Sequence, residues 1–109
     1  MSYNILPLPP FEKQIKRLVK KYPSLKSEYL NLIQSLEENP NQGSNIGNNC
    51  FKIRIAIASK GKGKSGGARV ITHIVIEDKT IYLLSIYDKS EQSDIQDKEL
   101  KMLLSSIER

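Results

Sequence analysis

The sequence has few of the residues that build disulfide frameworks, metal clusters or membrane spans. It contains one cysteine, Cys50, one histidine and no tryptophan. A single cysteine cannot form an internal disulfide or supply a cysteine-rich metal site, and it favours a reducing compartment. No run approaches the ~18 apolar residues of a membrane helix, and Met1–Pro10 lacks the basic and apolar regions of a secretory signal. We therefore expect a cytoplasmic protein with no metal, no other cofactor and no membrane partner.

The length and composition are those of one folded domain. The chain has 109 residues and a mass of 12.4 kDa, which matches the usual size of a single domain. Hydrophobic residues make up 39% of it and charged residues 27%, a balance that excludes a disordered chain. We expect residues 1–109 to form one domain.

Acidic residues are missing from the middle of the chain. The formal net charge is +5, yet residues 50–76 alone hold six bases and no acid, whereas residues 77–109 hold eight acids and five bases. The six bases are Lys52, Arg54, Lys60, Lys62, Lys64 and Arg69. Such a concentration is typical of a surface that binds a polyanion, although a solvated basic surface is the simpler alternative.

Apolar spacing predicts three helices. Apolar residues recur at helical intervals over 11–22 and again from 25 to about 39, with Pro23 between them and Ser24 placed to cap the second helix. Together they predict a helical hairpin. Near the C-terminus, Leu100, Leu103, Leu104 and Ile107 share one helical face, and Ser93 or Asp94 can cap that helix.

The sequence predicts about four strands, at 3–8, 51–58, 69–76 and 80–87. Apolar residues alternate over 51–58, and 69–76 and 80–87 are rich in β-branched and aromatic residues. Residues 41–49 and 60–67 are expected to be loops, and 77–79 a hairpin turn. The order β-α-α-β-β-β-α predicts an α+β fold with a small, mostly antiparallel sheet. We expect the helices to cover one face of the sheet, leaving Lys52 and Arg54 on an open face.

Three segments in the second half of the chain are distinctive when they occur together. They are KIR at 52–54, KGKGKSGGARVI at 60–71 and YLLSIYDKSE at 82–91. In this order they resemble the RelE/ParE superfamily of toxins, and within it the HigB-like, ribosome-dependent mRNA interferases of type II toxin–antitoxin modules. The resemblance covers about residues 48–104.

The resemblance implies a microbial RNase-like fold and a metal-independent endoribonuclease that cleaves translated mRNA in the ribosomal A site. It implies a cognate antitoxin as partner, with operator DNA bound only through the antitoxin complex. Cleavage by attack of the mRNA 2′-OH needs groups that move protons and cations that stabilise the phosphate in the transition state. Arginine suits the phosphate because its planar fork bonds two oxygens at once.

The matching positions give candidate site residues. Arg69 matches the arginine after the glycine pair and is the candidate transition-state clamp, and Lys52 and Arg54 match positions that bind the substrate backbone. The loop cations at 60, 62 and 64 are candidates for RNA binding, and Tyr87 for stacking on a base. The alternatives are structural: Arg69 pairs with Glu77 or with the C-terminal end of a helix, the loop lysines only keep a turn soluble, and the tyrosine packs in the sheet.

Two further residues are candidates for proton transfer or charge stabilisation. Histidine is the side chain whose ordinary pKa, about 6.5, suits proton transfer, and His73, by alternation, shares a side of its strand with Arg69, although a histidine in an apolar strand is commonly a packed residue. Some relatives carry an arginine and a tyrosine near the start of the last helix. This chain has Lys89, Ser90 and Gln96 in that region, so Lys89 is the candidate substitute.

Two other functions remain open at this point. One is that of the ParE branch, whose members inhibit DNA gyrase without catalysis, through the helical hairpin. The other is that of an inactive relative which retains antitoxin binding and control of its operon. A shared fold does not decide among these functions.

Overall fold

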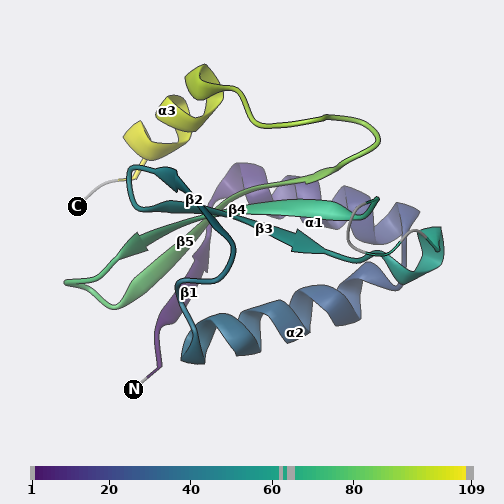
Figure 1. Ribbon diagram of the computed structural model, residues 1–109, viewed down its shortest axis with the longest axis horizontal. Coiled ribbons are helices and arrows are strands. Elements are labelled where there is room, and N and C mark those ends of the chain that lie inside the picture. The colour runs from purple at the N-terminus through teal and green to yellow at the C-terminus, as the bar shows by residue number, and fades with distance from the viewer. Residues whose placement is uncertain (1, 62, 64–65, 108–109) are drawn as a thin grey trace.

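The protein folds as a five-stranded mixed sheet with helices on both faces (Figure 1). The computed structural model describes residues 2–61, 63 and 66–107. This architecture confirms the expected α+β class. The elements, in chain order, are β1 (Asn4–Pro7), α1 (Pro9–Lys21), α2 (Leu25–Glu38), β2 (Ser44–Gly47), β3 (Cys50–Ile55), the 3-10 helix η1 (Ala58–Lys60), β4 (Ala68–Val75), β5 (Thr80–Asp88) and α3 (Asp97–Ser105).

The strands lie in the order β1-β5-β4-β3-β2. The first strand runs parallel to β5, and every other neighbouring pair is antiparallel. All eight residues of β4 are buried, because this strand is central and both of its faces are covered. The sheet therefore has two apolar layers, one on each side of β4.

The helical hairpin covers the first face of the sheet. The apolar spacing that predicts α1 and α2 places Phe11, Leu18 and Leu36 fully inside the larger core, against side chains of β3, β4 and β5. The first helix begins two residues earlier than expected, at Pro9. Proline is tolerated in a first helical turn because its missing N–H has no partner there.

The second face of the sheet is not open, which corrects the expectation that all helices lie on one side. Leu100 and Leu103 of α3 pack there with Ile71, Leu84 and Tyr87. Figure 1 shows α3 and α2 on opposite sides of the sheet. The physical reason is that β4 and β5 carry apolar residues on both sides, so each face needs a cover.

The fifth strand, β2, lies within the segment 41–49 that was expected to be a loop. Asn48 and Asn49 both adopt positive φ, 55° and 58°, and join β2 to β3 as a hairpin. Asparagine tolerates this conformation, and two such residues in sequence suit a tight hairpin turn. The count of about four strands therefore becomes five.

Ser24 is the N-cap residue of α2, as predicted, but its side chain makes no capping hydrogen bond, and the N-cap of α3 is neither Ser93 nor Asp94. The Ser24 hydroxyl oxygen precedes α2 but accepts the backbone N–H of Ser59 at 3.0 Å. The N-cap of α3 is Gln96, and Asp94 directs its carboxylate toward Lys52 instead.

Candidate cationic site

Three cations from neighbouring strands share one face of the sheet. In the sheet register, Arg69 of β4 lies between Arg54 of β3 and Tyr87 of β5 and is directly paired with both. Lys52 lies two residues before Arg54 on β3. Directly opposed residues in antiparallel strands project to the same side, so all four belong to the face that α3 partly covers. The structure thus brings together residues that are 35 positions apart in sequence, from 52 to 87. We call these four residues the cationic cluster.

Asp94 joins the cationic cluster from the segment between β5 and α3. Its Oδ1 atom lies 3.1 Å from Lys52 Nζ and accepts the hydroxyl of Tyr87 at 3.4 Å. The Lys52 ammonium holds the pKa of Asp94 below its usual range. Sequence reasoning considered this residue only as a helix cap. No local signal distinguishes the two roles, because the pairing spans 42 residues.

Tyr87 contributes its hydroxyl group to the cationic cluster, whereas its aromatic ring is buried. Its side chain is 4% exposed and packs in the apolar layer under α3. Burial, together with the Asp94 carboxylate, raises the pKa of Tyr87 to about 12, so the phenol is protonated at neutral pH. In this structure the ring offers no free surface for stacking on a base.

Arg69 is held against the sheet. Arg69 is 5% exposed, and its Nη1 atom donates a hydrogen bond to the carbonyl oxygen of Ala68 at 3.2 Å. A guanidinium keeps its charge even when it is buried. Arg69 therefore places a permanent positive charge in a region of low dielectric at the start of β4.

His73 lies on the same face as Arg69, as alternation predicts, but apart from the cationic cluster. It is four residues further along β4, or about 13 Å at the usual rise of a strand. The ring is 4% exposed, lies 6.5 Å from the Tyr82 ring between centroids, and has Nδ1 3.6 Å from Cys50 Sγ. Burial raises the pKa of Cys50 to about 11, so its thiol is protonated at neutral pH.

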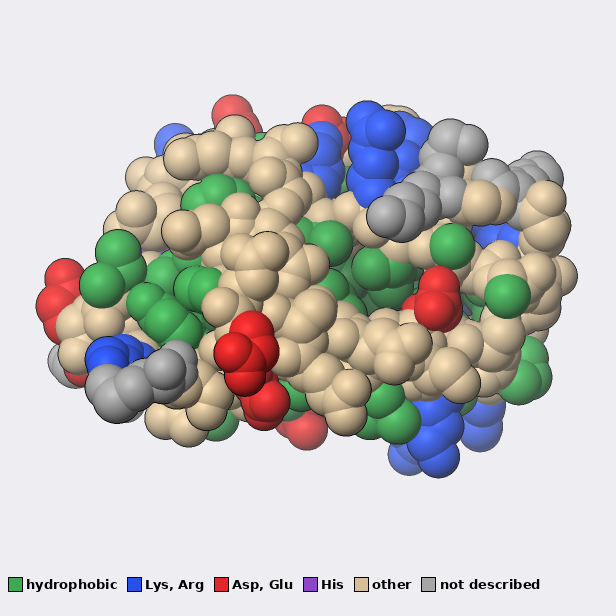
Figure 2. Space-filling view, turned by 60° about the horizontal axis from the view of Figure 1, so that its bottom comes forward, with side chains coloured by type: hydrophobic (Ala, Val, Ile, Leu, Met, Phe, Trp, Pro, Cys, Tyr) green, Lys and Arg blue, Asp and Glu red, His purple; other side chains and the backbone are tan. Residues whose placement is uncertain are grey.

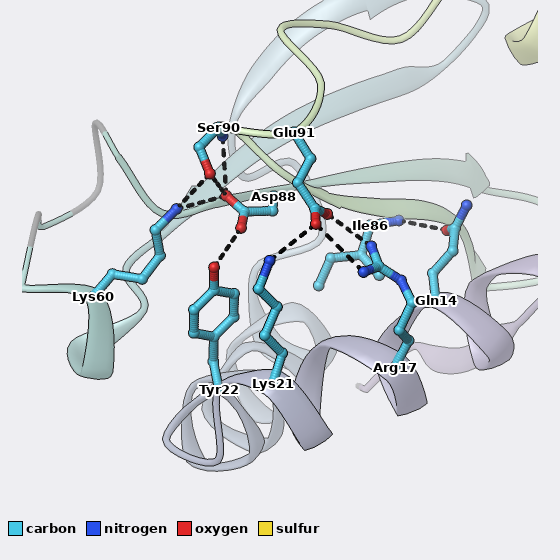
Figure 3. Close-up of polar contacts among 9 residues, drawn as sticks. All are labelled: Gln14, Arg17, Lys21, Tyr22, Lys60, Ile86, Asp88, Ser90 and Glu91. Atoms are coloured by element: carbon cyan, nitrogen blue, oxygen red, sulfur yellow. Dashed lines mark hydrogen bonds and ion pairs between the residues drawn. The ribbon is translucent and has the colours of Figure 1, made fainter.

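The structure places Lys60 away from solvent, in contrast to the loop position expected from sequence. Its side chain is 8% exposed, and Nζ lies 2.6 Å from Oδ1 of the buried Asp88. Figure 3 shows this pair next to Tyr22, the residue that follows α1. Lys62 and Lys64 lie outside the described residues.

Asp88 is an acidic residue of this region that sequence reasoning did not single out. Burial alone would raise the pKa of Asp88, but hydrogen bonds from Lys60, Ser90 and Tyr22 outweigh it and hold this pKa well below its usual range. The carboxylate is therefore ionised at neutral pH. It neutralises one of the six bases that the sequence concentrates in residues 50–76.

Lys89 lies just beyond β5, beside the segment that leads into Arg69. Its backbone N–H donates to Gly67 O at 3.0 Å, and its ammonium donates to Ser93 O at 2.9 Å. The side chain thus closes the turn after β5. These contacts place Lys89 near the start of β4, on the same edge of the molecule as the cationic cluster.

A groove runs beside the cationic cluster, between α2 and β3. It has a volume of about 270 Å³ with Leu32, Ile53 and Ile55 among its apolar residues, and Arg54 and Glu28 also line it. Figure 2 shows this hollow with hydrophobic side chains inside it and Lys and Arg side chains above it. Arg54 is exposed to solvent.

Two negative findings apply to the described part of the chain, residues 2–61, 63 and 66–107. No three His, Cys, Asp or Glu side chains gather there so that they could hold a metal ion. No helix in those residues is long and apolar enough to cross a membrane.

Comparison with known proteins identifies the family. The model of the family described as RelE toxin of the RelE / RelB toxin–antitoxin system matches residues 11–107. A mutant of E. coli toxin RelE in the free state is 14% identical, with a TM-score of 0.63 over 99% of this chain and 100% of that one. The same mutant in complex with a peptide of the antitoxin RelB is 16% identical, with a TM-score of 0.52, and the match covers 100% of this chain and 98% of that one. These structures share the fold, and the family match spans most of the sequence, so the chain belongs to the RelE toxin family.

Proposed function

We propose that this toxin is a ribosome-dependent endoribonuclease that cleaves translated mRNA and so inhibits translation. The observation that carries the proposal is the cationic cluster, in which Lys52, Arg54 and Arg69 occupy one face of adjacent strands. Three cations on one rigid sheet can bind consecutive phosphates of a single RNA strand. A toxin that only binds another protein has no need of such phosphate ligands.

The chemistry assigns different work to each cation. Attack by the mRNA 2′-OH on the neighbouring phosphate builds negative charge on the phosphate oxygens. Arg69 is the proposed clamp for that charge, because its fork bonds two oxygens and its low-dielectric position strengthens the attraction. Lys52 and Arg54 bind the backbone, and the loop bases Lys62 and Lys64 extend the RNA-binding surface. Lys89 contributes charge at the same edge.

The proposed partners follow from the same assignment. In the E. coli complex the toxin RelE is bound to a RelB antitoxin peptide. We propose that a cognate antitoxin likewise neutralises this chain by covering its cationic face, and that operator DNA is bound only through that complex. The toxin would act in the cytoplasm, where mRNA is translated.

Induced expression of the wild-type chain tests the proposal directly. Mapping mRNA 5′ ends by primer extension within minutes should show new cuts at defined codon positions. The matched control is the same transcript without its start codon, which should remain uncut. Arrest without cuts but with DNA damage signals would assign the chain to the gyrase-inhibiting branch. Neither arrest nor cuts would indicate an inactive relative that keeps antitoxin binding and operon autoregulation.

Lys52→Ala and Arg54→Ala should each weaken ribosome binding and reduce its salt dependence. Each phosphate contact that is lost removes about 0.7 from the slope of log K against log salt for single-stranded RNA. The control is Lys26→Ala, which removes the same charge from the exposed surface of α2. Ribosome pelleting across a series of KCl concentrations measures the slope. An equal slope for all three variants would show that the cationic cluster does not contact phosphates.

A further inference from the structure

Asp88 is a fully buried charge held by several hydrogen bonds. Its carboxylate has no exposed surface and accepts four hydrogen bonds, from Tyr22 OH at 2.8 Å, Lys60 Nζ at 2.6 Å, Ser90 N at 2.9 Å and Ser90 Oγ at 2.8 Å. Figure 3 shows these groups converging on it from the residue after α1, from η1 and from the turn after β5. An ionised carboxylate withdrawn from water needs such partners to be tolerated.

Both ends of the basic loop that joins β3 to β4 are attached at this point. The loop leaves the fold after Lys60, whose ammonium bonds Asp88. It returns at Gly67, whose carbonyl accepts the Lys89 N–H, and at Ala68, which pairs directly with Asp88 in the sheet. One residue of β5 therefore fixes where the loop begins and where it ends.

The two attachments differ in kind. The returning end is held by backbone contacts, the Lys89 N–H to Gly67 O bond and the pairing of Ala68 with Asp88, and a Cβ atom on Gly67 would collide with Ile55 O, so only glycine fits there. The departing end depends on side chains: the Lys60–Asp88 pair, and the Ser24 hydroxyl that accepts the Ser59 N–H. The start of the loop is thus the end that a single substitution can release.

We propose that Asp88 is a positioning residue for RNA binding: through Lys60 it holds the start of the basic loop beside the strand that carries Arg69. The inference rests on the proposed function and deepens it. It explains why Lys60, a base of the segment 50–76, pairs with a fully buried carboxylate. This lysine acts as a tether, and the loop bases that follow it in sequence act on RNA.

Glu91 provides a matched control from the same turn. Its carboxylate joins Arg17 at 2.7 Å and Lys21 at 3.1 Å, also between the turn after β5 and α1. Both of these pairs are exposed, and exposed pairs contribute little to stability. Glu91→Gln removes the same negative charge as Asp88→Asn but leaves the Lys60 tether intact.

The test compares wild type, Asp88→Asn and Glu91→Gln in a translation reaction that reports mRNA cleavage. Asp88→Asn should raise KM for programmed ribosomes about tenfold, which is the size of effect expected when one charge-assisted contact is lost. The value of kcat should change by less than about twofold. Glu91→Gln should match wild type in both constants. A purely structural defect would lower the active fraction, which reduces apparent kcat and leaves KM unchanged, and that result would overturn the inference.

Trypsin digestion of the folded proteins tests the Lys60–Asp88 attachment without a measurement of mRNA cleavage. Cleavage after residues 60–64 should be at least about fivefold faster in Asp88→Asn than in wild type, because local opening exposes the start of the loop. It should be unchanged in Glu91→Gln. Equal rates in all three proteins would overturn the inference even if KM changed. If wild type cleaves no mRNA, the proposed function fails, whereas this digestion and ribosome pelleting still decide whether Asp88 positions the loop.

Two variants at Lys60 keep the test decisive if Asp88→Asn does not fold. Lys60→Gln loses the charge that Asp88 binds, so it should reproduce the rise in KM and the faster digestion. Lys60→Arg retains a cation and should stay within about threefold of wild type. If Lys60→Gln has the same KM and the same rate of trypsin digestion as wild type, the inference is overturned.

Discussion

Arg69→Ala should reduce mRNA cleavage by about 10²–10³-fold in kcat, the usual effect of removing one preorganised group that stabilises transition-state charge. The effect is expected to be large because the guanidinium lies in a buried position, where its field is weakly screened. Lys52 and Arg54 occupy the same face but are more exposed, so they cannot replace it at the scissile phosphate. Single-turnover cleavage of a defined mRNA on programmed ribosomes measures kcat.

Arg69→Lys separates the charge from its geometry. Lysine keeps one positive charge but lacks the planar fork, so it should recover only part of the activity. Antitoxin capture and thermal unfolding of both variants verify that they are folded. A folded Arg69→Ala protein that cleaves at the wild-type rate would remove Arg69 from the mechanism.

Lys60→Met should lower the free energy of unfolding by about 3–5 kcal/mol, because it leaves a buried carboxylate without its cation. Lys60 Nζ lies 5.5 Å from the centroid of the Tyr22 ring. Methionine has an apolar side chain of similar length, so it keeps the packing beside this ring and removes only the charge. The comparison is Lys26→Met on the exposed surface of α2, which should change stability by less than about 0.5 kcal/mol. Urea denaturation at neutral pH gives both values.

Acid should reduce the difference between wild type and Lys60→Met. The pKa of Asp88 is 3.8 in the unfolded chain and is lower in the folded protein, so its contribution to stability is fully present above pH 3.8. That contribution is lost as the pH falls from 3.8 toward the lower folded value, when the carboxylate takes up a proton. The two unfolding free energies should therefore converge below pH 3.8. A constant difference down to the acid limit of folding would contradict the assigned ion pair.

Secondary structure was predictable wherever one residue pattern repeats over a whole element. Helical spacing predicts α1, α2 and α3, and alternation predicts β3, because each periodicity matches one backbone geometry. The β-branched and aromatic residues of β4 and β5 predict these two strands. The short strand β2 was not predictable in this way. Its pairing depends on a tight turn at Asn48 and Asn49, and asparagine pairs are equally common in loops.

The cationic site was predictable only in part. Strand alternation places Lys52 with Arg54, and the resemblance to known toxins selects Arg69, so the bases of the cluster were all available from sequence. The acids that organise this region were not. Asp94 meets Lys52 across 42 residues and Asp88 meets Lys60 across 28, and neither separation follows a local rule.

The sequence by itself determined the family, the α+β class, most helices and strands, and the concentration of positive charge in residues 50–76, because each of these depends on local pattern or on motif. Only the tertiary structure decided what each charge does. Sheet register brings Arg54 against Arg69, and packing of α1 against β5 buries Asp88 so that it draws Lys60 out of solvent. Burial changes the electrostatic role of a charge, and burial is a property of the folded chain rather than of its local sequence.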